Sequence, residues 1–365
     1  MAASHDTLQR LTDTLIEIVG ISSTSGQEEQ VRHYLAQQLA MLGIPTIVDA
    51  SGNLIGTLDT NGTSKERLLL NAHMDRVPPG LGHHPVLRDG ILYSDGTTNL
   101  GADDAAGIVI ILEILRRIVE QHLPHPPLLI VFTVQEEAGM CGAGVFDSTQ
   151  WPATHGIVFD NAFEAGVLVS QGAAYEAFDV TLTGRTGHPG KDLSQTVNVL
   201  DIFRHTSYPF GSLANDQTRI HIGRIHGGSA RNAIPDKLVL DGELRSFESA
   251  ERINGYKKSI HDAFVQTAEQ FGGHAEVTFK THTGGYKIDE NEALVQTYKQ
   301  VLAQRGAPLR MQPTFIGSDT SGFRPAIQAF TLSTGVVNEH SREEYVPIAP
   351  LEQVVEDTLQ VMQKL

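Results

Sequence analysis

Histidine and carboxylate residues recur in this sequence directly after apolar segments that predict buried strands. The first example is His73-Met74-Asp75, which follows the apolar residues 68–70. Residues two apart in an extended chain point to the same side, so Asp75 is expected beside His73, where a carboxylate can orient a metal-bound imidazole. For His-x-Asp taken alone, an ordinary hydrogen-bonded surface pair is the more common interpretation.

Two adjacent aspartates, Asp103 and Asp104, precede the apolar face of a long predicted helix that includes residues 108–119. A helix N-terminus favours a carboxylate, because its first N–H groups lack partners and the helix dipole is positive there. Aspartate is also a preferred N-cap residue. Each aspartate can therefore be a metal ligand or only a cap, and these residues alone leave both interpretations open.

Three further acids follow apolar runs. Glu136 and Glu137 come after residues 128–134, and Asp160 comes after residues 157–159. Adjacent acids at a strand end point in different directions, so one can bind a metal ion while the other handles protons. A pair of acids on a loop is usually solvated charge, but the long apolar run before this pair places it at the mouth of a core strand.

A second histidine, His340, follows the apolar residues 330–332 late in the chain. Alone, a histidine in such a place is more often structural. Taken together, however, the segments supply two imidazoles and several carboxylates at the ends of predicted strands, where sites form in open α/β sheets. This donor set suits zinc, with manganese or cobalt as possible occupants, and Cys141 is expected to be a bystander.

The pattern of apolar residues predicts two kinds of fold along the chain. Up to residue 174, unbroken apolar strands alternate with helices, which is typical of an α/β domain whose mixed sheet is covered by helices on both faces. Strands that alternate apolar and polar residues then predict a smaller inserted α+β domain with an antiparallel sheet at 175–287. The helical pattern returns from residue 292, so residues 288–365 are expected to rejoin the first domain. Ser25 and Glu28 match a capping box that opens an early helix.

Length and composition narrow the class of protein. A chain of 365 residues is long enough for two domains, and its net charge of -16 argues against nucleic acid as a partner. Its single cysteine excludes an intrachain disulfide and suits a reducing compartment. The first residues lack the layout of a signal peptide, and the apolar stretch at 107–119 is too short and too charged to cross a membrane. We therefore expect a cytoplasmic protein without a membrane partner.

Taken in order, these segments resemble the peptidase T-like branch of the metallopeptidase superfamily that includes carboxypeptidase G, aminoacylase and succinyl-diaminopimelate desuccinylase. The resemblance extends nearly from end to end and implies an enzyme with two divalent metal ions per subunit, most often zinc. Asp103 is implied to bridge the ions, and only the family's Asp-x-Lys-Gly pattern selects it over Asp104. Ala105 stands where many relatives have lysine, which is a departure from the family.

The resemblance also implies a role for each of the remaining residues. His73 and Asp160 would complete one metal site, and Glu137 and His340 the other. Glu136 would be the general base, and Asp75 would support His73. In the chemistry that these roles imply, two metal ions lower the pKa of a shared water and polarise the scissile carbonyl, while Glu136 moves the proton.

Four more residues are candidates for substrate contact. In the family the smaller domain is a lid whose histidine reaches the neighbouring subunit of a homodimer, and His188 in residues 184–190 matches it. Asn232 lies in a segment that resembles the substrate-touching part of that lid, and Ser318 in a loop that resembles a substrate-facing one. Arg245 is a candidate clamp for a substrate carboxylate. The residues alone also allow His188 to lie in an exposed turn and Arg245 to form a surface ion pair with Asp241 or Glu243.

The leading hypothesis is an exopeptidase that cuts short peptides, similar to a tripeptide aminopeptidase. A deacylase acting on an N-acyl amino acid, or a carboxypeptidase, is the nearest alternative. The lid segment with His188 and Asn232 argues against a related aminopeptidase family that assembles into larger shells. A non-catalytic binding protein on this scaffold would be expected to have lost Glu136 or a metal ligand, and the sequence retains them all.

Overall fold

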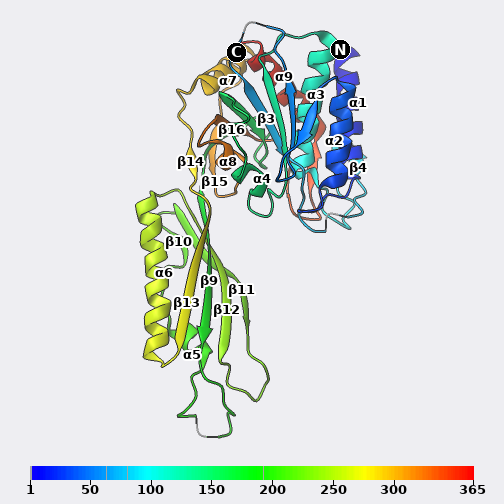
Figure 1. Cartoon of the computed structure of the whole chain (residues 1–365). Helices are drawn as coiled ribbons and strands as arrows, with labels where there is room; N and C mark the ends of the chain where they lie inside the picture. The colour runs from blue at the N-terminus through cyan, green and yellow to red at the C-terminus, as the bar shows by residue number, and fades with distance from the viewer. Residues whose placement is uncertain (1, 63, 80, 192) are drawn as a thin grey trace. The chain divides into compact units, whose positions relative to one another are not determined.

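The computed structural model describes residues 2–62, 64–79, 81–191 and 193–365 and divides into two compact units (Figure 1). The larger unit consists of residues up to 172 together with 287–365, and the smaller unit is the insertion at 173–286. The first has a mixed sheet with helices, and the second has an antiparallel sheet. The prediction of an α/β fold with a separate antiparallel-sheet domain is confirmed.

The sheet of the larger unit brings four parallel strands together at its centre. These are β6 (Leu128–Thr133), β3 (Leu68–His73), β7 (His155–Phe159) and β16 (Gln328–Leu332), in that spatial order. Because they are parallel, their carboxyl ends lie at the same edge of the sheet. The outer strands are β1 (Thr46–Val48), β2 (Leu54–Leu58), β8 (Leu168–Gly172), β14 (Tyr286–Lys287) and β15 (Met311–Thr314).

Helices cover both faces of this sheet, which explains why β3, β6 and β7 are buried along their whole length. On one face, α1 (Ala2–Val19), α3 (Ala102–Gln121) and α9 (Ile348–Met362) pack against one another, and α3 lies on β3 (Figure 1). Leu69 faces the other side, where its hydrophobic cluster includes Phe323 of α8 (Thr320–Phe323) and Ala143 of α4 (Cys141–Gly144). The remaining helices are α2 (Glu29–Met41) and α7 (Ala293–Gln304).

The capping box predicted for Ser25 and Glu28 is wrong. Helix α2 begins at Glu29, its N-cap residue is Glu28, and no side chain caps it. The Ser25 hydroxyl donates instead to Asp75, 2.6 Å away, and the Glu28 carboxylate accepts from the backbone of Gly26 and Gln135. The two side chains therefore join the helix entry to the loops at the carboxyl edge of the sheet.

A small three-stranded sheet completes the larger unit. It pairs β4 (Val86–Arg88) with β5 (Ile91–Tyr93), and β5 with β17 (Tyr345–Pro347). Strand β17 leads directly into α9. This small sheet therefore ties the segment before α3 to the C-terminal part of the chain.

The smaller unit is a five-stranded antiparallel sheet with two helices. Its spatial order is β10 (Gly211–Leu213), β11 (Thr218–Gly227), β12 (Lys237–Ser246), β9 (Ala174–Thr183) and β13 (His274–Thr283). Alternate residues of β9 are buried, as the alternating sequence predicts. They form a core with side chains of β12, α5 (Val199–His205) and α6 (Ala250–Gln270), which includes Phe178, Leu240 and Phe264.

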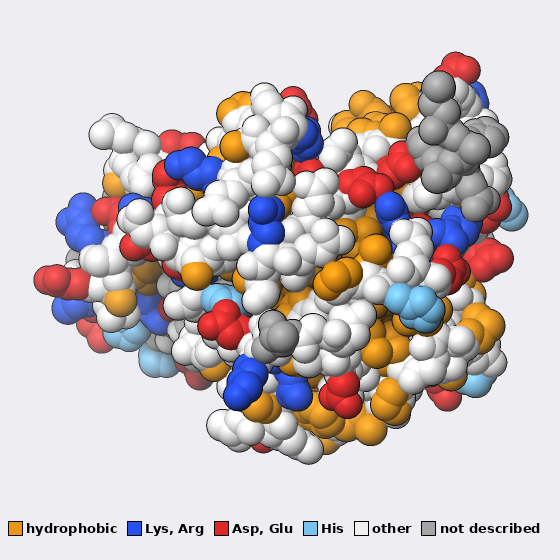
Figure 2. Space-filling view, turned by 90° about the horizontal axis from the view of Figure 1, so that it is seen from above, with side chains coloured by type: hydrophobic (Ala, Val, Ile, Leu, Met, Phe, Trp, Pro, Cys, Tyr) orange, Lys and Arg blue, Asp and Glu red, His pale blue; other side chains and the backbone are white. Residues whose placement is uncertain are grey.

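The chain has 43 acidic and 27 basic side chains of Asp, Glu, Lys and Arg, and both kinds lie on its surface (Figure 2). On the face that Figure 2 presents, acidic and basic side chains are interspersed, so the excess of acid is not gathered there into one field. Cys141 is a free, exposed thiol. Among the described residues, no helix combines the length and the apolar character that a membrane-spanning segment needs.

Candidate active site

The parallel strands and the loops that follow them bring five predicted residues to one edge of the sheet. His73 is the last residue of β3, and Glu136 and Glu137 follow the end of β6. Asp160 follows β7 directly, and β16 leads to the loop that contains His340. Ligands bind outside the carboxyl ends of strands in such sheets, so this edge is the expected place for a site.

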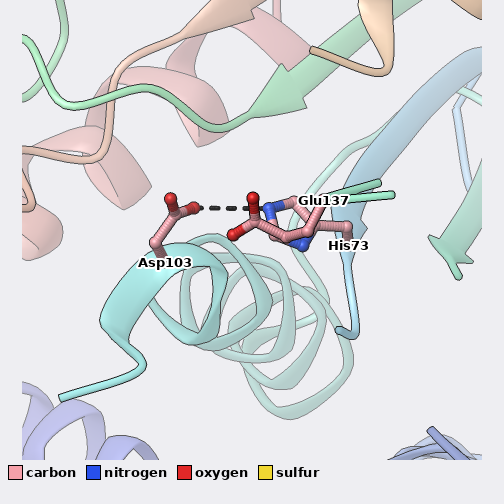
Figure 3. A group of neighbouring side chains, drawn as sticks. All are labelled: His73, Asp103 and Glu137. Carbon is pink, nitrogen blue, oxygen red and sulfur yellow. Dashed lines mark ion pairs between the residues drawn. The ribbon is translucent and has the colours of Figure 1, made fainter. Parts of the chain in front are cut away.

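Three predicted metal ligands come together at this edge. Ligand atoms of His73, Asp103 and Glu137 all lie within 4.8 Å of one another. Figure 3 shows Asp103 projecting from the start of α3 toward His73 at the end of β3, with Glu137 beside them. Because each side chain comes from a different element, the group forms only in the folded chain.

Asp103 lies between two imidazoles. Its Oδ1 is 3.3 Å from Nε2 of His73, and its Oδ2 is 3.1 Å from Nε2 of His340. The same Nε2 of His340 is 2.8 Å from Oε1 of Glu137. One carboxylate thus presents a separate oxygen to each histidine, which is the arrangement that a ligand shared by two cations requires.

Asp75 holds the end of β3 to the loop that bears the two glutamates. Its carboxylate accepts hydrogen bonds from the backbone N–H groups of Glu136, at 2.9 Å, and Glu137, at 3.2 Å. It also lies 3.5 Å from Nδ1 of His73. Burial raises the pKa of Asp75, but the hydrogen bonds from His73 and Ser25 and the charge of His73 outweigh burial and lower it. Asp75 is therefore an anion that orients three neighbours.

Asp104 points away from the histidines and takes the role of a cap. Its Oδ1 accepts from the N–H of Gly107, and its Oδ2 accepts from the N–H of His73 at 3.2 Å. Burial, together with the charges of Asp160 and Asp103, raises the pKa of Asp104 well above its ordinary value. Of the two roles that the sequence left open, Asp104 therefore takes that of a cap, whereas Asp103 is turned toward the cluster, as a metal ligand would be.

Glu136 has a free carboxylate. In the described part of the chain no group donates a hydrogen bond to it, while its backbone N–H is held by Asp75. Burial raises its pKa well above the ordinary value of a glutamate, and the charges of Asp160, Asp319 and Glu137 add to the effect. A carboxylate in this state is suited to accept and release a proton.

Buried acids surround the cluster. Burial and the charge of Asp103 raise the pKa of Asp160 to about 8, and burial raises that of Asp319 to about 6. Hydrogen bonds to Asp103 and Glu137 raise the pKa of His340 to about 11. Without a cation, these side chains keep their protons to a higher pH than the same groups do when exposed. A divalent cation would therefore compete with protons for the same atoms.

This electrostatic arrangement predicts how the stability of the metal-free protein depends on pH. Groups whose pKa is raised on folding bind more protons in the native state, so their stabilisation is present at low pH and is lost as pH rises through the folded pKa. Asp319, Asp160 and Glu344, with its pKa at about 7, set the window. We expect the melting temperature of the chelated protein to fall from about pH 4, where these carboxyls ionise in the unfolded chain, to about pH 8.

Thermal melting with and without a divalent cation measures this effect. Because a cation replaces the protons, the difference in melting temperature between loaded and chelated protein should widen as pH rises. A chelated protein that becomes more stable over the same range would show that these carboxyls are ionised in the metal-free fold.

Sequence reasoning missed Glu344. This carboxylate is 1% exposed and accepts four backbone hydrogen bonds from Leu100, Gly101, Ala102 and Asp103. The acidic pair 343–344 before the apolar Val346 gives no local sign of such a partner. The segment that it binds lies more than half the chain away, so only the fold brings the two together.

The loop with Ser318 borders the cluster, but its polar side chains face the core. A Cβ atom at Gly317 would lie 3.9 Å from Oε1 of Glu136, so this loop passes beside that carboxylate. Ser318 is buried, with its hydroxyl 2.8 Å from that of Thr331, and Asp319 accepts a hydrogen bond from Thr133. Substrate contact by Ser318 remains a prediction.

The other three candidate substrate residues belong to the smaller unit. His188 and Asn232 are exposed, and Nδ1 of His188 accepts from the N–H of Gly190. Arg245 pairs with Glu243 at 3.0 Å and stacks over the ring of Tyr175 at 4.2 Å. Arg245 thus forms one of the ion pairs that the sequence allowed, and its role as a substrate clamp remains a prediction.

The larger unit gathers imidazole and carboxylate groups at the carboxyl edge of a mixed sheet, and the smaller unit is an inserted antiparallel-sheet domain. The chain matches the model of Peptidase family M20/M25/M40 over residues 69–365 and belongs to that family. It is therefore a hydrolase that acts on peptide bonds.

Solved structures place the chain within this family. A tripeptidase from Staphylococcus aureus is 32% identical, with a TM-score of 0.92, and 98% of each chain is covered. The aminopeptidase PepT from Bacillus cereus is 27% identical, with a TM-score of 0.88 and the same coverage. A dinuclear metal-binding peptidase from Bacillus subtilis shares the fold at 14% identity and a TM-score of 0.74, covering 99% of this chain and 98% of that one. The predicted resemblance to peptidase T is confirmed.

Proposed function

We propose that the protein is a metal-dependent exopeptidase that removes the N-terminal residue of short peptides, tripeptides above all. The observation that supports it most is the position of Asp103 between His73 and His340, with the free carboxylate of Glu136 on the adjoining loop. The similarity to a tripeptidase and to an aminopeptidase supports the substrate class and the direction of attack. The single cysteine supports a cytoplasmic location.

The residues at this edge fit two divalent cations. Imidazole and carboxylate together are donors that zinc, manganese and cobalt accept. In the proposal His73 and Asp160 hold one ion, Glu137 and His340 hold the other, and Asp103 is shared. Zinc is the proposed metal, and the fold shared with a dinuclear peptidase supports the number of ions. When bound, the ions polarise the scissile carbonyl and acidify water.

The protein's own residues then move the proton and hold the geometry. Glu136 takes a proton from the attacking water as its oxygen bonds to the carbonyl carbon. It returns this proton to the amine nitrogen as the C–N bond breaks, and the second proton of the water also passes to the amine, so the products are a carboxylate and an ammonium group. Asp75 holds the backbone of Glu136 in place and keeps the ring of His73 oriented.

We further propose that the smaller unit is a lid and that the protein works as a homodimer. In this proposal His188 stabilises the developing oxyanion at the site of the neighbouring subunit, while Asn232 and Arg245 contact the substrate. The exposure of His188 and Asn232 is compatible with this role. Mixing inactive His188→Ala and Glu136→Gln proteins should restore activity if the histidine acts across subunits, and a mixture that stays inactive would argue against it.

Metal content measured alongside hydrolysis of a di-, tri- and tetrapeptide panel, before and after chelation, tests the main proposal. About two zinc or manganese ions per chain and chelator-sensitive cleavage of tripeptides with a free N-terminus are expected. Cleavage of N-acyl amino acids instead would identify a deacylase, and release of the C-terminal residue would identify a carboxypeptidase. Bound metal with no hydrolysis of any of these would contradict the proposal.

A further inference from the structure

The carboxylate of Glu344 accepts four backbone hydrogen bonds from the segment that leads to Asp103. We infer that Glu344 is a positioning residue: its carboxylate fixes residues 100–103 and thereby directs the carboxylate of Asp103 toward His73 and His340. The inference that it thereby sets metal affinity rests on the proposed function. The inference that it orders the segment rests on the fold alone.

The contact uses the full acceptor capacity of the carboxylate. Oε2 accepts from the N–H groups of Leu100, at 2.8 Å, and Gly101, at 2.9 Å. Oε1 accepts from those of Ala102, at 2.8 Å, and Asp103, at 3.2 Å. An ionised carboxylate has about four lone-pair positions, and here each of them faces a backbone donor.

The bound segment cannot order itself as an ordinary helix start. Gly101 has a φ of 72°, in the left-handed region, and Asp103 and Asp104 depart from helical angles. The first N–H groups of a helix need outside partners, and the N-cap residue Gly101 has no side chain to supply one. Glu344 is the partner for these donors.

Arg76 confines the same segment from another side. A Cβ atom on Gly101 would lie 2.6 Å from Cδ of Arg76, so the backbone passes closely over this side chain. Arg76 is 1% exposed, and its guanidinium donates to the carbonyls of Ile18 and Val19 at the end of α1. The segment before Asp103 thus lies between an anchored arginine and the carboxylate of Glu344.

Glu344 also connects the two residues of one contact in the cluster, His340 and Asp103. It lies shortly after His340, and its own carbonyl accepts from the N–H of Ser94 at 3.0 Å. Its side chain binds the backbone of Asp103, whose Oδ2 is 3.1 Å from His340. One residue therefore sets the spacing between the strand-end loop that carries His340 and the helix start that carries Asp103.

Glutamine at this position tests the inference because it keeps the size of the side chain but only one acceptor oxygen. Two of the four N–H groups would then face an amide NH₂. In the Glu344→Gln variant we expect zinc affinity, measured by competition with a chelator, to fall about 10- to 100-fold, as when a group that orients metal ligands is lost. The kcat should fall with little change in KM, and excess zinc should restore part of the activity.

A second readout does not depend on zinc. In metal-free protein, hydrogen–deuterium exchange of residues 100–103 should be faster in Glu344→Gln than in wild type, while exchange in β3 and β6 stays the same. Asp357→Asn is the control, because Asp357 of α9 is also buried in the larger unit but pairs with Arg305 at the end of α7. It should lower thermal stability without changing zinc affinity or exchange at 100–103.

The outcomes separate the two levels of the inference. A folded Glu344→Gln protein with wild-type zinc affinity and wild-type exchange at 100–103 would overturn it. If that variant does not fold, Glu344→Asp, which keeps the charge on a shorter side chain, should show the same changes at smaller size, and wild-type values there would also overturn it. If wild type binds no zinc, the proposed function fails, whereas the exchange comparison still tests the positioning of the segment.

Discussion

Replacing Glu136 by glutamine should lower kcat on a tripeptide by roughly 10²- to 10⁴-fold while the metal content stays near that of wild type. The carboxylate of Glu136 has no hydrogen-bond donor in the described structure, so the amide removes no contact that holds the loop. The backbone N–H remains bound to Asp75. What the substitution removes is the ability to take up a proton. Steady-state kinetics and elemental analysis of the same preparation measure both quantities.

Glu137→Gln is the matched comparison, because it changes the adjacent residue in the same way. Oε1 of Glu137 is 2.8 Å from His340 and belongs to the group of three close ligand atoms. This variant should lose metal as well as activity. A Glu136→Gln enzyme with normal turnover would require another base, and Asp319, buried nearby with its pKa raised to about 6, would be the next residue to test.

Replacing Asp103 by asparagine is expected to remove both metal binding and activity. The amide can offer one oxygen, whereas Asp103 presents one oxygen to His73 and the other to His340. Loss of several kcal/mol of transition-state stabilisation corresponds to a fall in kcat/KM of at least about 10³-fold. Calorimetric zinc binding and peptide hydrolysis measure the two losses.

Asp104→Asn provides the control for this prediction. Asp104 is adjacent in sequence, but its oxygens accept from the backbone of Gly107 and His73, and burial raises its pKa well above the ordinary value of an aspartate. Asparagine there loses one of the two acceptor oxygens but none that faces a histidine Nε2, so the variant should lose some stability and retain most of its zinc affinity. Metal loss in Asp104→Asn but not in Asp103→Asn would reverse the assignment that the family pattern suggests.

Much of the fold could be predicted because apolar periodicity reports burial directly. The strands that end at His73 and precede Glu136 and Asp160 are mostly apolar and buried along their whole length because helices cover both faces of their sheet. The inserted unit was recognisable because its strands alternate, as strands with one solvated face do. These patterns place the candidate residues at strand ends, and the sequence therefore predicts that they form one site.

The contacts that the sequence did not predict are those between distant polar residues. The spacing of Ser25 and Glu28 matched a capping box. In the fold, however, the Ser25 hydroxyl donates to the carboxylate of Asp75, 2.6 Å away. Glu344 is missed for the same reason, since its four donors lie at residues 100–103. Local patterns encode helix ends and strand faces, whereas buried carboxylates find partners only through the tertiary fold.

The position of β16 has a consequence for synthesis of the chain. This strand lies between β7 and β8, although it follows them by more than a hundred residues and comes after the whole insertion. A nascent chain that emerges from the ribosome N-terminus first therefore exposes the edge of β7 until residues 328–332 have been made. His340 and Glu344 follow this strand, so the proposed site can assemble only after residues 340–344 have been made. A nascent chain that stops short of these residues therefore lacks part of the proposed hydrolytic centre.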